Sequence, residues 1–201
     1  MKCTLTDAAR VTGALLQGQD RPFGQVCTDT RTLEAGELFV ALRGPNFDAN
    51  EFVGAAHERG AAGAIVERPQ PTPLAQLVVR DSQAALTALA RAWREEFTLP
   101  LIGVAGSNGK TTVKEMTAAI MAQAGTCLAT RGNLNNHIGV PLTLLRLDPT
   151  HASAVVEMGA NRAGDIAALA ALARPTVGLV TNAGAEHLEG SGSLAGVARA
   201  E

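Results

Sequence analysis

The sequence predicts an α/β protein in which a small α/β domain precedes a parallel sheet with helices on its faces. From about residue 83 onward, short apolar runs alternate regularly with segments of helical periodicity, which is typical of such sheets. Before residue 82 the elements are shorter and mixed, so we expect domains of residues 1–82 and 83–201. Hydrophobic residues make up 46% of the chain and charged residues 18%, a balance that favours a folded globular protein.

The first domain is predicted from apolar runs and helix-stop signals. Three apolar runs are expected to form its strands: 38–42, 64–66 and 77–79. Thr6 and Asp7 could cap a small helix that ends at Gly13, and a second helix is expected over 52–59, before Gly60. These short elements together indicate a small α/β domain.

The second domain is predicted to alternate strands and helices. A helix capped by Asp81 or Ser82 leads into it and ends before Pro100, which cannot continue a helix. The expected strands are 101–104, 127–130, 154–158 and 177–181. The expected helices are 111–124, 141–147 and 166–172. The last residues, 193–201, read as the first turns of a further helix, which suggests a fragment of a longer protein.

Composition and charge exclude some classes of function. The net charge of −2 argues weakly against a polyanionic partner such as nucleic acid. No run approaches the roughly 20 apolar residues that span a bilayer, so a cytoplasmic protein is expected. Cys3, Cys27 and Cys127 lack metal-ligand spacing and cannot all pair, so we expect reduced, buried thiols.

The sharpest chemical motif is a Gly-rich turn between a predicted strand and a predicted helix. Its residues are Gly106, Ser107, Asn108, Gly109, Lys110, Thr111 and Thr112. Glycines let backbone N–H groups turn toward phosphate oxygens, and the helix N-terminus adds its dipole. Lys110 would supply a cation to the phosphates and the Thr111 hydroxyl a Mg²⁺ ligand. Val104 stands where the general pattern has a first Gly, so this is a shorter variant of an ATP-binding loop.

Two residues after later strands are candidates for catalysis or metal binding. Glu157 ends the strand predicted at 154–158, where a carboxylate projects toward the edge at which ligands of such sheets bind. It could hold Mg²⁺, which prefers oxygen ligands, or be a solvated strand end. His187 lies in a Gly-rich loop beyond the next strand, and a lone loop His is usually a surface residue.

Two polar segments could contact a substrate. Asn133, Asn135 and Asn136 offer amide donors and acceptors that suit sugars and peptides, although a turn-rich loop would have the same composition. The second segment is weaker and consists of Thr28, Asp29, Thr30 and Arg31. Arg31 could pair with a phosphate, but a surface Arg in a loop is common.

These motifs together resemble the Mur ligases of peptidoglycan synthesis, the F-type in particular, over all 201 residues. The Mur-type loop is Gly-x-x-Gly-Lys-Thr, which accounts for Val104. The segments that carry the resemblance are 106–116, 132–136, 139–145, 187–190, 192–196, 28–31 and 36–44. The resemblance implies a protein of three domains: a UDP-substrate domain, a central ATPase domain and a C-terminal domain. This chain would hold the first domain and about half of the second, without the C-terminal domain.

The resemblance also implies a reaction and roles for residues. ATP would phosphorylate the terminal carboxylate of UDP-N-acetylmuramoyl-tripeptide, and the amine of D-alanyl-D-alanine would attack the acyl phosphate. Lys110 would grip ATP, Thr111 and Glu157 would hold one Mg²⁺, and His187 a second. The segment 133–136 would line the peptide channel and 28–31 would bind the UDP-sugar. A cytoplasmic monomer that inserts into no membrane and binds no nucleic acid is expected.

Three positions depart from the family pattern. Ala49-Asn50 stands where Gly-His is frequent, which puts any sugar contact by that His in doubt. Ser191 replaces a common Phe. Glu201 lies where many members have a carbamylated Lys, and we expect it to take over as a metal ligand, since a carboxylate offers the same terminal oxygens. The alternatives are that Glu201 is a solvated helix residue or that the matching Lys lies just past residue 201.

Two other functions remain open at this stage. A ligase like folylpolyglutamate synthetase would share the central fold and loop, but that family begins directly with the ATPase domain. A truncated, non-catalytic nucleotide-binding module is the second alternative. The 201-residue chain alone is expected not to complete the ligation.

Overall fold

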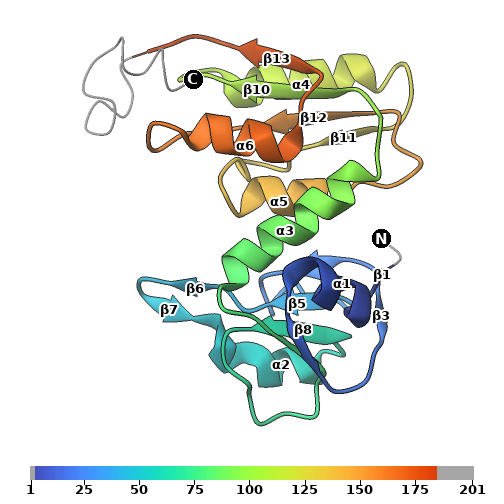
Figure 1. Cartoon of the computed structure of the whole chain (residues 1–201). Helices are drawn as coiled ribbons and strands as arrows, with labels where there is room; N and C mark the ends of the chain where they lie inside the picture. The colour runs from blue at the N-terminus through green and yellow to red at the C-terminus, as the bar shows by residue number, and fades with distance from the viewer. Residues whose placement is uncertain (1–2, 185–201) are drawn as a thin grey trace. The chain divides into compact units, whose positions relative to one another are not determined.

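The computed structural model describes residues 3–184, which divide between two units, Met1–Ala92 and Trp93–Glu201 (Figure 1). This division and the predicted boundary at residue 82 both fall on helix α3 (Ser82–Glu95). Asp81 caps α3 as expected, because its carboxylate accepts a hydrogen bond from the N–H of Ala84 at 2.9 Å. Across residues 3–184, every helix is too short or too polar to cross a membrane.

The first unit is built on a mixed five-stranded sheet in the order β2-β9-β8-β5-β4. The strands are β2 (Leu15–Gln17), β4 (Val26–Cys27), β5 (Leu38–Val40), β8 (Gly63–Val66) and β9 (Gln76–Val78). All neighbours are parallel except β2, which runs antiparallel to β9. The three apolar runs therefore form strands as predicted, and these strands lie at the centre of the sheet. The outer strands β2 and β4 were not predicted, because two or three residues are too few to show a period.

The helices and two short antiparallel strand pairs of the first unit complete this fold. They are α1 (Leu5–Thr12), a 3₁₀ turn η1 (Ala49–Phe52), α2 (Val53–Glu58) and the strand pairs β1 (Cys3–Thr4) with β3 (Pro22–Phe23) and β6 (Arg43–Gly44) with β7 (Phe47–Asp48). The predicted cap of α1 was wrong. Thr4 caps it, because the Thr4 hydroxyl accepts from the N–H of Asp7 while the Asp7 carboxylate accepts from the N–H of Thr4.

Asn50 is a buried polar residue that ties several elements of the first unit together. Its side chain is 2% exposed. Its amide oxygen accepts from the N–H of Glu67 at 3.1 Å, and its amide nitrogen donates to Asp48 at 2.6 Å. The Glu67 carboxylate accepts in turn from the N–H and the hydroxyl of Ser82, at the start of α3. The residue that departs from the family pattern therefore has an internal structural role.

The second unit is a four-stranded, fully parallel sheet in the order β11-β12-β10-β13. Its strands are β10 (Leu101–Ala105), β11 (Cys127–Ala129), β12 (Ser153–Glu157) and β13 (Val177–Val180). The helices are α4 (Lys110–Met121), α5 (Gly139–Leu144) and α6 (Asp165–Ala173). This alternation and the parallel sheet confirm the prediction, with shifts of one to three residues at the ends.

The direction of the crossovers decides which face each helix covers. From β10 the chain passes through α4 to β11, which is one edge strand of the sheet. From β12 it passes through α6 to β13, the opposite edge strand. Because crossovers between parallel strands are right-handed, opposite directions place α4 and α6 on opposite faces (Figure 1). The face under α4 is filled by Ile102, Val104 and Val155. The two connections diverge at β10 and β12, which are neighbours, and ligands bind beside such a point at the carboxyl ends of the strands.

The three cysteines differ from expectation in one respect. Cys27 and Cys127 are free, as predicted, but all three cysteines, Cys3 included, are half-buried and not fully buried. All three lie in strands at the margins of their sheets, where solvent reaches part of the side chain.

Candidate functional site

The predicted phosphate-binding loop connects the carboxyl end of β10 to the first residue of α4. Gly106 and Gly109 have φ angles of +122° and +81°, which side chains with a Cβ rarely adopt. A Cβ on Gly106 would lie 2.2 Å from the Thr181 hydroxyl and 2.9 Å from the backbone of Thr181 and Asn182. The loop therefore needs glycine at this position for its conformation and for its close contact with the end of β13.

The residues that follow β13 hold the loop in place. The Asn182 side chain accepts from the N–H of Asn108 at 3.1 Å and donates to its carbonyl at 3.0 Å. The Thr181 hydroxyl donates to the same carbonyl at 2.7 Å. Ser107 donates its N–H to the Asn182 carbonyl at 2.9 Å, and its hydroxyl accepts from the N–H of Gly184 at 2.8 Å. The conformation of the loop thus depends on two strands and not on its own glycines alone.

Lys110 begins α4 and its ammonium lies over the loop. Its Nζ donates to the carbonyls of Gly106 and Ser107, the latter at 2.9 Å. The Lys110 side chain is half-buried, whereas Thr111 and Thr112 are exposed in the first turn of α4. A cation, a helix N-terminus and a turned backbone therefore converge at one place, which is the arrangement that binds phosphate.

Glu157 ends β12, the strand beside β10, and pairs in register with Val104. It is 1% exposed. One carboxylate oxygen accepts from the Asn135 side chain at 2.8 Å. The other, Oε2, is buried and has no hydrogen-bond partner among the described residues. A buried carboxylate oxygen without a partner is costly, so this atom points to a partner outside the described residues, such as a bound cation.

The residues fit the magnesium ion that the sequence predicts. The unpaired Glu157 oxygen and the exposed Thr111 hydroxyl are hard oxygen donors, which is the type that Mg²⁺ prefers. Two further predicted metal ligands, His187 and Glu201, lie outside the described residues. The expected catalytic role of His187 lies there too. No cluster of three or more His, Cys, Asp or Glu side chains occurs within 3–184.

The three predicted asparagines separate in the structure. Asn135 reaches Glu157, and its close approach leaves no room for a Cβ on Gly159, which would lie 2.9 Å from the amide carbon. Asn136 serves its own backbone, because its side-chain oxygen accepts from the N–H groups of Ile138 and Gly139 at the start of α5. Asn133 is exposed. Asn135 is the member of the set that joins the site.

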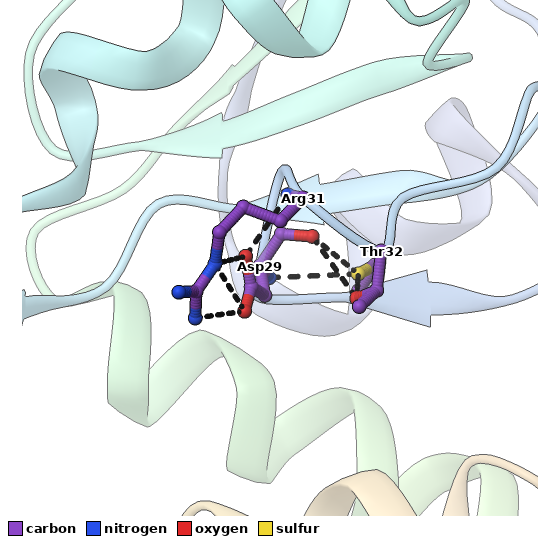
Figure 2. Close-up of polar contacts among 4 residues, drawn as sticks. Asp29, Arg31 and Thr32 are labelled. Carbon is purple, nitrogen blue, oxygen red and sulfur yellow. Dashed lines mark hydrogen bonds and ion pairs between the residues drawn. The ribbon is translucent and has the colours of Figure 1, made fainter.

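The Thr28 to Arg31 segment belongs to the first unit. The Arg31 guanidinium and backbone N–H donate to Asp29 at 2.6–3.1 Å, as Figure 2 shows. The side-chain hydrogen bonds from Arg31 lower the pKa of Asp29 to about 2. Arg31 nevertheless remains 87% exposed, while Thr28 and Thr30 are half-buried. The segment is an ordered, exposed turn with an Arg that could also reach an anion.

Three residues of the site were missed by sequence analysis: Thr130, Thr181 and Asn182. All are polar and come directly after an apolar strand, Thr130 after β11 and the other two after β13. Thr130 accepts from the N–H of Glu157 at 2.9 Å. The signal that singled out Glu157, a polar residue at the carboxyl end of a parallel strand, would have found them as well.

Comparison with known proteins gives consistent results. Residues 104–201 match the model of the Mur ligase middle domain. UDP-N-acetylmuramoyl-tripeptide–D-alanyl-D-alanine ligases are similar over most of this chain. The protein from Escherichia coli (strain K12) is 50% identical over 198 residues, and that from Bacillus subtilis (strain 168) is 42% identical over 179 residues.

Solved structures agree with these relatives. A crystal structure of MurF from Acinetobacter baumannii is 39% identical, covers 100% of this chain and has a TM-score of 0.93. MurF from Thermotoga maritima in complex with ADP is 33% identical, covers 88% of this chain and has a TM-score of 0.78. The chain spans 44% of the Escherichia coli relative, 39% of the Bacillus subtilis relative, and 45% and 41% of the two solved chains.

Proposed function

Because the chain belongs to the Mur ligase family, we propose that its residues serve an ATP-dependent ligase that joins D-alanyl-D-alanine to UDP-N-acetylmuramoyl-tripeptide. The observation that carries this proposal is the pairing of a phosphate loop with the buried, unpaired Glu157 oxygen on the adjacent strand. The relatives named for this reaction, and the neighbour solved with ADP, support it.

The proposed chemistry follows from the need to activate a carboxylate. A carboxylate does not condense with an amine in water, because one of its oxygens would have to leave as oxide or hydroxide, and both are poor leaving groups. Transfer of the γ-phosphoryl group of ATP to the tripeptide carboxylate gives an acyl phosphate and ADP. Attack by the D-alanyl-D-alanine amine then forms the amide and releases phosphate and a proton.

The residues of the second unit would bind and orient the nucleotide. The N–H groups of the loop would donate to phosphate oxygens, which are the acceptors that a turned backbone and a helix N-terminus favour. Lys110 would exchange its hydrogen bonds to loop carbonyls for bonds to phosphate oxygens and so place its charge where negative charge develops. Thr181 and Asn182 would keep the loop in the conformation that allows this.

Glu157 and Thr111 would hold the magnesium ion, and His187 and Glu201 are proposed to hold a second. Bound Mg²⁺ supplies positive charge beside the phosphate oxygens and lowers their repulsion of an incoming carboxylate. Asn135 fixes one Glu157 oxygen, so the carboxylate can present the other oxygen in one orientation. For the substrate, we propose that residues 28–31 contact the UDP-sugar and that Asn133, Asn135 and Asn136 lie along the path of the peptide. The protein is further proposed to be a cytoplasmic monomer.

The test measures phosphate release under multiple turnover by the full-length protein. We expect release to require ATP, UDP-N-acetylmuramoyl-tripeptide and D-alanyl-D-alanine together. Lys110→Ala should slow it by about 10²–10³-fold, the usual effect of removing one well-placed group from such a site. Arg91→Ala, an exposed change on α3, is the matched control and should behave like the parent.

Other outcomes would favour the alternatives. Phosphate release with a folate and glutamate would indicate a folylpolyglutamate-synthetase-like ligase. ATP binding without turnover on any substrate set would indicate a non-catalytic nucleotide-binding module. Near-normal turnover by Lys110→Ala would overturn the role of the loop.

A further inference from the structure

Lys114 is a buried cation for which the proposed reaction gives no role. It lies on α4, four residues after Lys110, and its side chain is 0% exposed. Its Nζ donates to the carbonyl of Thr130 at 2.9 Å and to the carboxylate of Glu115 at 2.5 Å. An apolar residue could fill this position without the cost of removing a charge from water, so the ammonium requires an explanation.

Thr130 connects this ammonium to Glu157. It follows β11, is 2% exposed and donates its own N–H to the Val155 carbonyl at 3.1 Å. Its carbonyl accepts from Lys114, while its hydroxyl oxygen accepts from the N–H of Glu157 at 2.9 Å. One residue therefore links α4 to the end of β12 through two different atoms.

The Glu157 end of this chain of contacts is where a ligand would bind. Thr130 fixes the Glu157 backbone, and Asn135 fixes one side-chain oxygen. The other oxygen, Oε2, is left without a partner among residues 3–184. The orientation of that free oxygen thus depends on where Thr130 and Asn135 hold the residue.

We propose that Lys114 is a positioning residue that acts through Thr130 to orient the Glu157 carboxylate toward a divalent cation. The ammonium holds the Thr130 carbonyl against α4, the helix that begins in the phosphate loop, and so keeps Glu157 at a fixed distance from the loop. The inference rests on the proposed function, since it takes the Glu157 oxygen to be a magnesium ligand. It concerns how the metal is held and not which groups bind the phosphates.

Replacement of Lys114 by Met separates a positioning role from a purely structural one. Met has a similar length and no charge, and the Glu115 carboxylate that loses its partner is exposed to solvent, so no buried charge is left unpaired. Lys114→Met should therefore fold with a lowered melting temperature, because the buried Thr130 carbonyl loses its donor, and it should lose the anchor of Thr130. Contacts that orient metal ligands typically change metal affinity by about 10–100-fold.

The experiment titrates Mg²⁺ into the full-length protein with a non-hydrolysable ATP analogue and follows analogue binding by calorimetry. We expect Lys114→Met to raise the Mg²⁺ concentration for half-maximal enhancement by about 10-fold or more. Analogue affinity measured in EDTA should change less than about 2-fold, because the phosphate loop keeps its contacts. Thr130→Val, which removes the hydroxyl that Glu157 contacts, should give the same pattern, and Lys114→Arg should partly restore the parent midpoint.

Each other result overturns the inference. An unchanged Mg²⁺ midpoint in Lys114→Met would show that the ammonium does not position Glu157. A loss of analogue affinity in EDTA as large as the loss with Mg²⁺ would indicate that Lys114→Met disturbs α4 in general and not the position of Glu157. If Lys114→Met does not fold, a parent-like midpoint in Thr130→Val would refute the inference. Failure of the parent to bind the analogue at all would instead refute the proposed function.

Discussion

Two carboxylates show how the surroundings of a single residue decide its chemistry. Asp29 receives three side-chain contacts from Arg31 and one from the backbone, in a turn that faces solvent. Glu157 is 1% exposed, with one oxygen bound by Asn135 and the other without a partner in the part of the chain that the structure describes. The first carboxylate is satisfied by its neighbours, whereas the second still requires a ligand. The proposed metal site therefore rests on Glu157.

The Asp29–Arg31 pair gives a prediction about pH. The pKa of Asp29 is lowered to about 2, first by the side-chain hydrogen bonds from Arg31. Because the folded pKa lies below the unfolded one of about 3.9, the pair stabilises the fold above pH 4 and loses this effect as the pH falls through about 2. Arg31→Met should raise the pKa of Asp29 toward its ordinary value, measured by NMR titration of the carboxyl carbon.

Asp148 provides the internal control for that titration. Its pKa is lowered mainly by the backbone N–H of Thr150, which Arg31→Met does not touch. An unchanged pKa of Asp29 in the variant would contradict the assigned cause.

Asn50 gives a prediction about stability. Asn50→Ala removes the acceptor of the Glu67 N–H and a donor to Asp48. Loss of a partner for buried polar groups costs about 1–3 kcal/mol, so the free energy of unfolding in urea should fall by that amount. Asn161→Ala changes an exposed residue and should leave it within about 0.5 kcal/mol of the parent. Equal values for the two variants would show that the Asn50 contacts contribute nothing.

At the scale of elements, the conformation of the loop between β10 and α4 also depends on contacts with the residues that follow β13. Gly106 and Gly109 both have positive φ angles but different surroundings. A Cβ on Gly106 would meet Thr181 and the backbone of Asn182, whereas a Cβ on Gly109 would meet nothing within 4 Å. The two glycines therefore separate the effect of backbone strain from that of contact with β13.

Alanine at each glycine makes this difference measurable. Gly109→Ala should lower the free energy of unfolding by about 1–2 kcal/mol, the cost of a left-handed backbone for a residue with a Cβ. Gly106→Ala adds a clash with backbone atoms and should cost more and weaken nucleotide binding further. Thermal unfolding with and without ATP compares them, and equal losses in the two variants would show that the contact with Thr181 is unimportant.

Much of the second unit could be predicted from sequence, and much less of the first. Apolar runs of four or five residues identified β10, β12 and β13, and the glycines and Lys110 identified the loop. The two-residue strands β1, β3, β4, β6 and β7 carry no period, so no pattern could reveal them. The positions of Asn182 and Thr130 just after strands could have marked them as candidates, but their partners could not be predicted. The pairing of β13 with β10 depends on the three-dimensional order of the strands.

At the scale of the whole molecule, the chain spans less than half of the relatives it matches. The part present contains the proposed groups for ATP, whereas attack on an acyl phosphate also requires an amine held in the correct orientation. Such orientation can lower a barrier by about 7–11 kcal/mol. The described residues contain no assigned site for that amine.

The chain of residues 1–201 should therefore bind ATP but form no amide product. Mass spectrometry of the reaction with ATP and both substrates would detect the amide, and calorimetry would report ATP binding. The full-length protein is the positive control. Detection of product from the 201-residue chain would refute the expectation.

The order of strands in the second unit also has a consequence for synthesis on the ribosome. β10 leaves the ribosome first but pairs only with β12 and β13, whose residues lie far later in the sequence. At roughly 5–20 residues per second, its five buried residues wait several seconds for their neighbours. The nascent chain then exposes an apolar strand that chaperones could bind. The loop takes its final shape only after residues 181–184 arrive, so the ATP of the proposed function would stabilise the finished unit but could not guide its early folding.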